Sequence, residues 1–394
     1  MKKLIYIFLF IQIFTNAFAI SSVLTPAFAV SIVLFGIGVL RRDVFIDTKE
    51  PFLLCGFYFI LLFSYLTMST GEKCFNHLLM WSVPAFLYYY TFKRQMCMLF
   101  TVDEFEHKAL KVITLSTLTA SSFAVFEFLA VNVLGVSMSF IPRGTVEDYT
   151  PLALDSIRAR SFMEESGQFS FFLEAFAPLS VYWIHRNVKR DLLEWLMYAV
   201  MAVALFVSFS AAGYALFLIG GVIFVFYQMK NSKSASNIVG ILFMLLIVAL
   251  IVFVIFPDVY ESIRLIIEGK LDPESSSHHD RANRFVALQH FQGIAILFGY
   301  GPAAFSTLRI ESFVSFYLGV LMSTGIIGTL FLVLFFLRQY HYLFKLKNYS
   351  LKITLIISLT MVLLHLAFVD NIYTPWLWVL LSFIYFARTK QIAR

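Results

Sequence analysis

The stretch Arg158-Ala-Arg-Ser-Phe-Met-Glu-Glu-Ser-Gly-Gln-Phe-Ser-Phe-Phe-Leu173 places two arginines and two carboxylates at the start of an otherwise apolar helix. An ionisable side chain at membrane depth costs about 2.5–3.5 kcal/mol on insertion scales, so a cluster of them needs a partner, a wet cavity or a ligand. On a helix that begins near Ser161, Glu165 and Gln168 share one face. The stretch therefore predicts a substrate pocket at the outer surface of a membrane protein.

The composition of the whole chain agrees with a membrane protein. Of 394 residues, 60% are hydrophobic and 14% are charged, against about 25% charged in a soluble domain. The net charge of +6 is carried by short basic clusters at the ends of apolar runs, where membrane topology explains it better than nucleic-acid binding does. Cys55, Cys74 and Cys97 lie in separate segments, so neither a disulfide framework nor a zinc site is indicated.

Apolar runs of about 20 residues are long enough to cross a bilayer, and their number predicts an all-α polytopic protein with about twelve transmembrane helices. They lie at 4–20, 23–40, 51–69, 75–92, 110–136, 161–184, 192–210, 211–229, 238–256, 312–337, 353–369 and 375–387. The first run also fits a signal peptide that ends at Ala17-Phe-Ala19, and the two alternatives give the later spans the same orientation.

With both termini in the cytoplasm, 21 of the 30 Lys and Arg lie on the cytoplasmic side, as the positive-inside rule demands. This threading divides the chain into three parts. Residues 1–256 carry helices one to nine with a periplasmic loop at 137–160, residues 257–311 form a large periplasmic loop, and residues 312–394 carry the last three helices.

The two outer loops hold most of the outer arginines, which are Arg143, Arg158, Arg160, Arg264, Arg281, Arg284 and Arg309. Positive charge outside runs against the insertion rule, so an anionic ligand is the simplest reason to keep it there. The alternative is that these arginines pair with acidic residues of the same loops. Within the large loop, 280–296 is apolar close to a helical period, which predicts an amphipathic helix on the membrane surface.

Three features resemble the O-antigen polymerase (Wzy) and O-antigen ligase family of bacterial inner-membrane glycosyltransferases. Arg160-Ser-Phe-Met-Glu-Glu165-Ser-Gly-Gln is similar to the family's outer arginine followed by "(S/G)-x-F-x-E-P-S/N", with Ser166 where proline is usual. Arg281 with Gly299-Tyr-Gly-Pro302 resembles the arginine and "LFGxGxG" turn of its large loop. Ser323-Thr-Gly325-Ile-Ile-Gly328 looks like its "GxxG" helix.

The resemblance implies that glycan is transferred from an undecaprenyl-pyrophosphate carrier to an acceptor sugar on the periplasmic face of the inner membrane, without a metal or other cofactor. In ligases a histidine stands eleven residues before the "GxxG" motif, and here that place is Val314. This difference favours a polymerase of O-antigen or a related surface polysaccharide, with membrane lipid around it and a chain-length regulator as a further partner. An O-antigen ligase and a transporter or flippase of lipid-linked glycan remain the alternatives.

The chemistry assigns roles to the charged residues. The leaving pyrophosphate gathers negative charge, which arginine stabilises by gripping phosphate oxygens in two places, and the acceptor hydroxyl must lose a proton. Glu165 is the candidate general base, or else it pairs with Arg160. The predicted catalytic residues are Glu165, Arg160 and Arg281, and the predicted pyrophosphate- or glycan-binding residues are Arg158, Arg284, Gln168, Arg309 and Glu311.

Three buried acidic positions have no role that the sequence can name. Glu127 lies inside an apolar span and Asp370 at an outer helix end, and both are functional candidates because they place charge close to lipid. Glu174 lies deeper in its span and could bond a neighbouring helix. His278-His279-Asp280 lies in a polar loop without further ligands at zinc-site spacing, so we expect it to be solvated rather than to bind a metal.

Overall fold

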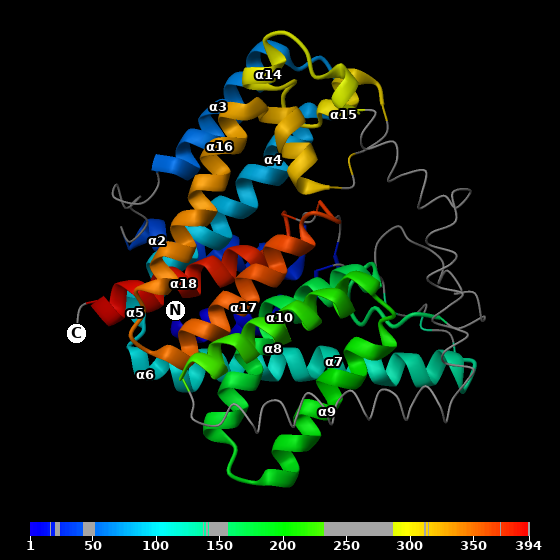
Figure 1. Cartoon of the computed structure of the whole chain (residues 1–394), viewed down its shortest axis with the longest axis vertical. Coiled ribbons are helices and arrows are strands. Elements are labelled where there is room, and N and C mark those ends of the chain that lie inside the picture. Colours follow the sequence, from blue (N-terminus) through cyan, green and yellow to red (C-terminus); the bar gives the residue numbers. More distant parts are fainter. Residues whose placement is uncertain are drawn as a thin grey trace.

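The structure is a computed structural model of the chain (Figure 1). It describes residues 1–15, 17–19, 24–41, 52–136, 138, 141, 157–231, 287–310, 313, 315–370 and 372–392. Within these ranges the chain is helical and contains no strand.

The helices follow one another with short connections wherever consecutive elements are both described. Their bounds are α1 Lys2–Ile11, α2 Pro26–Leu40, α3 Phe52–Met68, α4 Cys74–Ala85, η1 Phe86–Thr91, α5 Phe92–Leu99, α6 Val102–Glu104, η2 Phe105–Ala109, α7 Leu110–Asn132, α8 Ser166–Asn187, α9 Asp191–Val207, α10 Ala211–Asn231, η3 Ala287–His290, α14 Ala295–Phe298, α15 Ala304–Leu308, α16 Phe316–Phe344, α17 Tyr349–His365 and α18 Pro375–Ile392. Here η1 and η2 are π-helical and η3 is a 3-10 helix.

Two continuous helices of the described chain are long and apolar enough to cross a membrane. One runs from Val102 to Asn132 through α6, η2 and α7, and the other is α16, with 31 and 29 residues. At 1.5 Å per residue both exceed the roughly 30 Å of a hydrocarbon core. Four shorter apolar helices lie at Pro26–Leu40, Phe52–Met68, Ala211–Tyr227 and Tyr349–His365.

The helices pack as a bundle around α8 and α18. Helix α8 lies between α7 and α17, α10 packs against α17, and α16 packs against α3. Helix α18 contacts α5, α16 and α17, and its Trp376 and Trp378 are fully buried. Large aromatic side chains on the buried face of α18 thus form the centre of the core.

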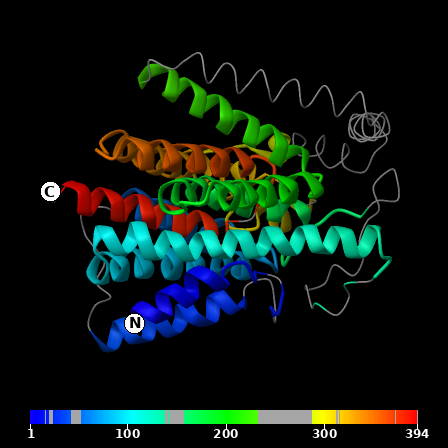
Figure 2. The same cartoon turned by 90° about the horizontal axis from the view of Figure 1, so that it is seen from below.

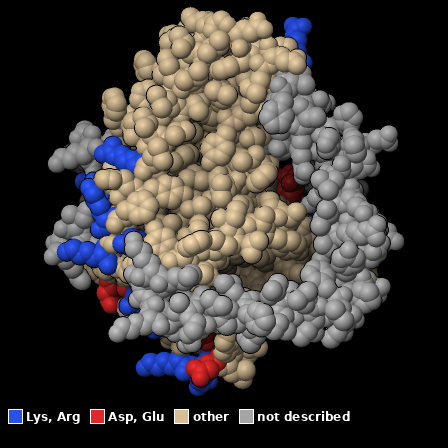
Figure 3. Space-filling view, in the orientation of Figure 1, with Lys and Arg blue, Asp and Glu red and all other residues tan. Residues whose placement is uncertain are grey.

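The two ends of the bundle differ in charge. Both termini lie toward the left in Figure 2, at the end that we call the near end, while α7 runs from this end to the opposite, far end. In Figure 3 the visible Lys and Arg side chains gather along the left edge, and most of the remaining described surface is uncharged. Lys2 and Glu104 form an ion pair of 2.7 Å between α1 and α6 at the near end. The Arg388 guanidinium lies 3.6 Å from the ring centroid of Tyr342, joining α18 and α16.

The helices overlap every predicted span except 238–256, which lies outside the described residues. Two local predictions are wrong. The span predicted from residue 161 begins as a helix only at Ser166, because Ser161 has a φ of 53° and ends any helical path there. The amphipathic helix predicted over 280–296 is not continuous in its described part, since η3 ends at His290, Gly293 has a φ of 59°, and α14 begins at Ala295.

Candidate functional site: the far end of helix α8

The turn that precedes α8 is held by a buried carboxylate of α7. Oε2 of Glu127 accepts backbone N–H bonds from Arg160 at 2.9 Å and from Ser161 at 2.7 Å. The Ser161 hydroxyl donates to the carbonyl of Ala120 at 2.8 Å. Glu127 is 1% exposed, and an acceptor for two backbone amides explains why a charge lies inside this apolar helix.

Further hydrogen bonds fasten the same segment to the far ends of α7 and α9. The side-chain amide of Asn132 donates to the Ile157 carbonyl at 2.9 Å and its oxygen accepts from the Ile157 N–H at 2.6 Å. The Ala159 N–H donates to the carbonyl of Val207 at 3.0 Å. Residues 157–161 are therefore fixed to two helices that lie on either side of α8.

The two arginines of this segment lie at different depths. The Arg160 guanidinium donates to the backbone carbonyl of Glu164 at 3.0 Å, and Arg160 is 9% exposed. Arg158 is half-buried, and burial lowers the pKa of its guanidinium, while the nearby Glu165 carboxylate and the Tyr214 phenol act in the opposite direction. Both arginines remain cations at neutral pH because the ordinary pKa of arginine is above 12.

The connection between α17 and α18 completes the polar cluster. The buried Gln168 side chain hydrogen-bonds the Tyr373 hydroxyl, and Tyr373 also interacts electrostatically with Glu164, Asp370 and Glu165. Oδ1 of Asp370 is buried and has no hydrogen-bond partner among the described residues. Burial raises the pKa of Asp370 to about 7. We call this group the entrance cluster; it consists of Arg158, Arg160, Glu164, Glu165, Gln168, Asp370 and Tyr373.

The structure brings together four of the predicted site residues, Arg158, Arg160, Glu165 and Gln168, but corrects how two of them are arranged. Glu165 is the N-cap of α8 with extended backbone, so Glu165 and Gln168 do not share a helical face. Glu165 is exposed rather than buried. Arg160 bonds the main chain of Glu164, and the arginine beside the Glu165 carboxylate is Arg158.

The other predicted site residues do not join the entrance cluster in the described chain. Arg309 is the exposed C-cap of α15, which packs against α4 and α16. Arg281, Arg284 and Glu311 lie outside the described residues, as do His278, His279 and Asp280.

Below the entrance cluster, α8 and α17 are joined by a buried pair. Nδ1 of His365 lies 2.8 Å from both carboxylate oxygens of Glu174, and the two side chains are 1% and 0% exposed. The ring of Phe171 packs against the imidazole with centroids 5.1 Å apart. The expectation that Glu174 bonds a neighbouring helix is confirmed. The pair fixes α8, which carries the arginine side of the cluster, to α17, which leads to Asp370.

The two glycine motifs meet in space. The N–H groups of Tyr300 and Gly301 donate to the carbonyls of Met322 and Ser323 at 2.8 and 3.0 Å. Helix α16 is broken at Gly325, whose φ is 63°. A Cβ on Gly325 would lie 2.3 Å from the Leu297 carbonyl. These glycines allow a loop and a broken helix to approach backbone to backbone, which is a structural role.

Sequence reasoning missed Tyr373 and gave Asp370 and Glu127 no role. Asp370 and Tyr373 are separated from α8 by about 200 residues of chain, and nothing local to either of them indicates that they meet Gln168. The signal that could have found them is the polar sequence Asp370-Asn-Ile-Tyr373 between two apolar spans. Such a group in an outer connection indicates a shared polar site.

Comparison of the chain with models of known protein families and with characterised proteins finds no match.

Proposed function

We propose that the chain is a polytopic inner-membrane glycosyltransferase that polymerises undecaprenyl-pyrophosphate-linked oligosaccharide repeats of O-antigen or a related surface polysaccharide. In this proposal about twelve helices span the membrane, both termini are cytoplasmic, and the entrance cluster faces the periplasm. The proposal rests on the sequence resemblance and on the arrangement of charge.

The membrane placement is supported by the apolar helices and by the two ends of the bundle. The near end, with both termini, carries Lys and Arg at helix ends, which is the pattern of a cytoplasmic face. The far end carries fewer basic residues, and two of them, Arg158 and Arg160, belong to one built cluster. With this orientation the cluster lies at the periplasmic surface.

The observation that carries the proposal is the entrance cluster itself, in which two fixed arginines lie beside several carboxyl and hydroxyl groups. Arg160 is held from its backbone by Glu127 and from its guanidinium by the Glu164 carbonyl, so its position is set before any ligand arrives. Preorganised cations of this kind stabilise charge that develops on a leaving pyrophosphate. We assign Arg158 and Arg160 to the pyrophosphate, and Arg281 and Arg284 to the same ligand on the strength of the resemblance.

The proposed reaction transfers a growing glycan to the next repeat. A hydroxyl of the acceptor sugar attacks C1 of the donor sugar, the bond between C1 and the pyrophosphate oxygen breaks, and undecaprenyl pyrophosphate leaves with the electron pair. The hydroxyl proton passes to a carboxylate of the cluster. Glu165 and Asp370 are the two candidates, and the unpartnered buried Oδ1 of Asp370 favours the second.

The test uses purified protein with a synthetic undecaprenyl-pyrophosphate repeat, and product ladders are compared by gel electrophoresis. Wild type and Arg41→Ala, a change at the near end, are expected to give a ladder. Arg160→Ala is expected to lose it by a factor of about 100 or more, as removal of one preorganised donor does elsewhere. A folded Arg160→Ala protein that polymerises normally would contradict the site.

The same preparation distinguishes the alternatives. Single transfer of glycan to a lipid A–core acceptor, without extension, would favour the ligase. Movement of lipid-linked glycan across vesicles without bond formation would favour the transporter and end the enzyme proposal.

A further inference from the structure

A second feature lies at the near end of the bundle, on the opposite end of α8 from the entrance cluster. A cavity of about 680 Å³ opens between α8, α9, α10 and α17. This volume lies within the range of about 300–1,000 Å³ that is usual for ligand sites. The proposed reaction leaves the cavity unused.

The walls of the cavity are apolar. They include Val181 of α8, Phe217 and Phe224 of α10, and Ile353 and Ile357 of α17. At its base α10 and α17 touch, since a Cβ on Gly220 would lie 2.8 Å from the Met361 sulfur. One residue further along α10, a Cβ on Gly221 would meet nothing within 4 Å. The cavity thus has a closed base and open space beside Gly221.

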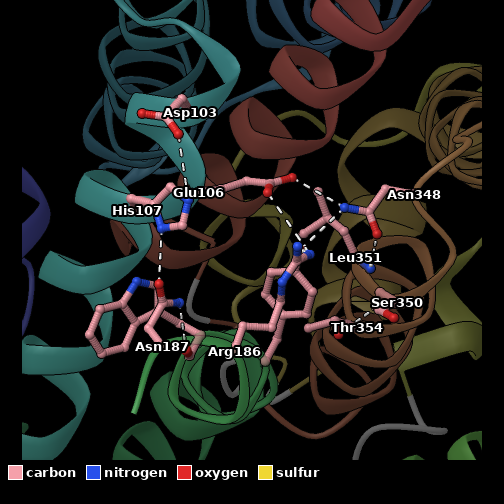
Figure 4. Close-up of polar contacts among 11 residues, drawn as sticks. Asp103, Glu106, His107, Arg186, Asn187, Asn348, Ser350, Leu351 and Thr354 are labelled. Atoms are coloured by element: carbon pink, nitrogen blue, oxygen red, sulfur yellow. Dashed lines mark hydrogen bonds and ion pairs between the residues drawn. The ribbon is translucent and has the colours of Figure 1, made fainter. Parts of the chain in front are cut away.

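The mouth of the cavity is polar and cationic. Arg186 and His185 of α8 line it together with Ser350 of α17, and the Arg186 side chain is 48% exposed. Figure 4 shows Arg186 between Glu106 and the start of α17. Its guanidinium bonds the Tyr182 hydroxyl and lies 3.9 Å from the Glu106 carboxylate, a long distance that leaves much of the positive charge exposed to the mouth.

The chain around the mouth adds further positive charge. Lys189 and Arg190 follow α8, and Lys345, Lys347 and Lys352 flank the turn into α17. The acidic residues nearby are Glu106 and Glu194, and Glu194 pairs with His185 at 3.1 Å. Positive charge therefore exceeds negative charge where the apolar cavity meets the near end.

We propose that this cavity binds one anionic glycerophospholipid of the cytoplasmic leaflet, with an acyl chain between α8, α10 and α17 and the phosphate at Arg186. The inference rests on the membrane placement proposed above. An acyl chain gains no hydrophobic free energy by leaving one apolar environment for another, so the cavity supplies shape and the headgroup supplies selectivity. Basic pockets between spanning helices on the cytoplasmic side suit anionic headgroups.

The experiment measures retained lipid by native mass spectrometry after exchange of the full chain into phosphatidylglycerol or phosphatidylcholine with identical acyl chains. Wild type is expected to retain one phosphatidylglycerol and to prefer it by about tenfold or more. Arg186→Gln is expected to lose the preference, and Arg186→Lys to keep most of it. Equal retention of both lipids by wild type would overturn the proposal.

A matched pair of glycine variants tests the cavity independently of Arg186. Gly221→Phe fills the open space and is expected to abolish the retained lipid. Gly36→Phe on α2 also enters open space but lies away from the cavity, so it is expected to retain the lipid as wild type does. Unchanged retention in Gly221→Phe would overturn the acyl-chain site.

Two further arms keep the interpretation clear. Water-soluble glycerol 3-phosphate is expected not to displace the lipid, because it lacks the chain that fills the cavity; displacement would mean that the site binds phosphate alone. No glycan substrate is present, so loss of lipid retention and loss of polymerisation in the ladder assay are separate results.

Discussion

Glu127 shows how a single buried charge can serve the backbone rather than the substrate. Its Oε2 accepts two main-chain N–H bonds from the turn that positions Arg160, and Ser161 in that turn has a φ of 53°. A left-handed residue of this kind costs free energy, which the surrounding hydrogen bonds must offset. The carboxylate therefore supports the site without touching the ligand.

Removing this carboxylate is expected to destabilise the protein. Glu127→Ala leaves two buried N–H groups without an acceptor, at about 1–3 kcal/mol each. Glu127→Gln keeps one carbonyl oxygen and is expected to cost less. Thermal unfolding in detergent, followed by tryptophan fluorescence, measures both. If Glu127→Ala unfolds at the wild-type temperature, the turn is not held as described.

Asp370 gives the protein a stability that depends on pH. Burial raises its folded pKa to about 7, above its ordinary value near 3.8. A raised carboxyl pKa means that the protonated form favours folding, so this contribution is present below pH 4 and is lost as pH rises through 7.

Asp370→Asn removes this dependence. The variant is expected to match wild type in melting temperature near pH 4 and to exceed it by several degrees near pH 8, since each pKa unit corresponds to about 1.4 kcal/mol. Melting curves at both pH values provide the check, with the exposed Glu165→Gln as the control that shows no such difference. A constant offset at all pH values would contradict the burial of the carboxyl group.

At the scale of helices, the break in α16 is a point where substitution has a definite sign. Gly325→Ala places a Cβ 2.3 Å from the Leu297 carbonyl at a φ of 63°, and we expect a loss of more than about 2 kcal/mol. Gly36→Ala adds a Cβ in open space within a helix and is expected to gain about 0.5–1 kcal/mol. Unfolding temperatures should move in opposite directions, and equal shifts would argue against the close approach at Gly325.

The link between α8 and α17 can be measured by a double-mutant cycle. Removing one partner of a buried pair leaves the other without compensation, so Glu174→Gln and His365→Gln alone are each expected to cost several kcal/mol, up to about 5. The double variant is expected to cost less than the two together, with a coupling of about 1–3 kcal/mol. Additive effects would mean that the 2.8 Å contact does not couple the helices.

The success and failure of sequence reasoning divide along the same elements. Apolar runs predicted the positions of the helices because the period and length of hydrophobic residues are local properties. The start of α8 was predicted five residues early, since the left-handed Ser161 turn depends on Glu127, more than 30 residues away in the chain. The entrance cluster was found in part, because its arginines lie together in sequence whereas Asp370 and Tyr373 come from a distant connection.

At the scale of the whole molecule, the proposed orientation makes one prediction that needs no substrate. In a background with Cys55, Cys74 and Cys97 changed to serine, Glu165→Cys is expected to react in intact cells with a maleimide that cannot cross membranes. Lys347→Cys, at the near end, is expected to react only after the cells are opened. Labelling of Lys347→Cys in intact cells would reverse or refute the orientation.

The contact between the glycine turn and α16 bears on how relatives of this protein can be recognised. Peptide groups make the contact, so the side chains of Tyr300, Met322 and Ser323 are not what holds it. Over evolutionary time those side chains are free to change while the spacing of the glycines must stay. Two chains could thus share this architecture and retain in common little more than a few glycines, which is too short a signature for sequence alignment to detect.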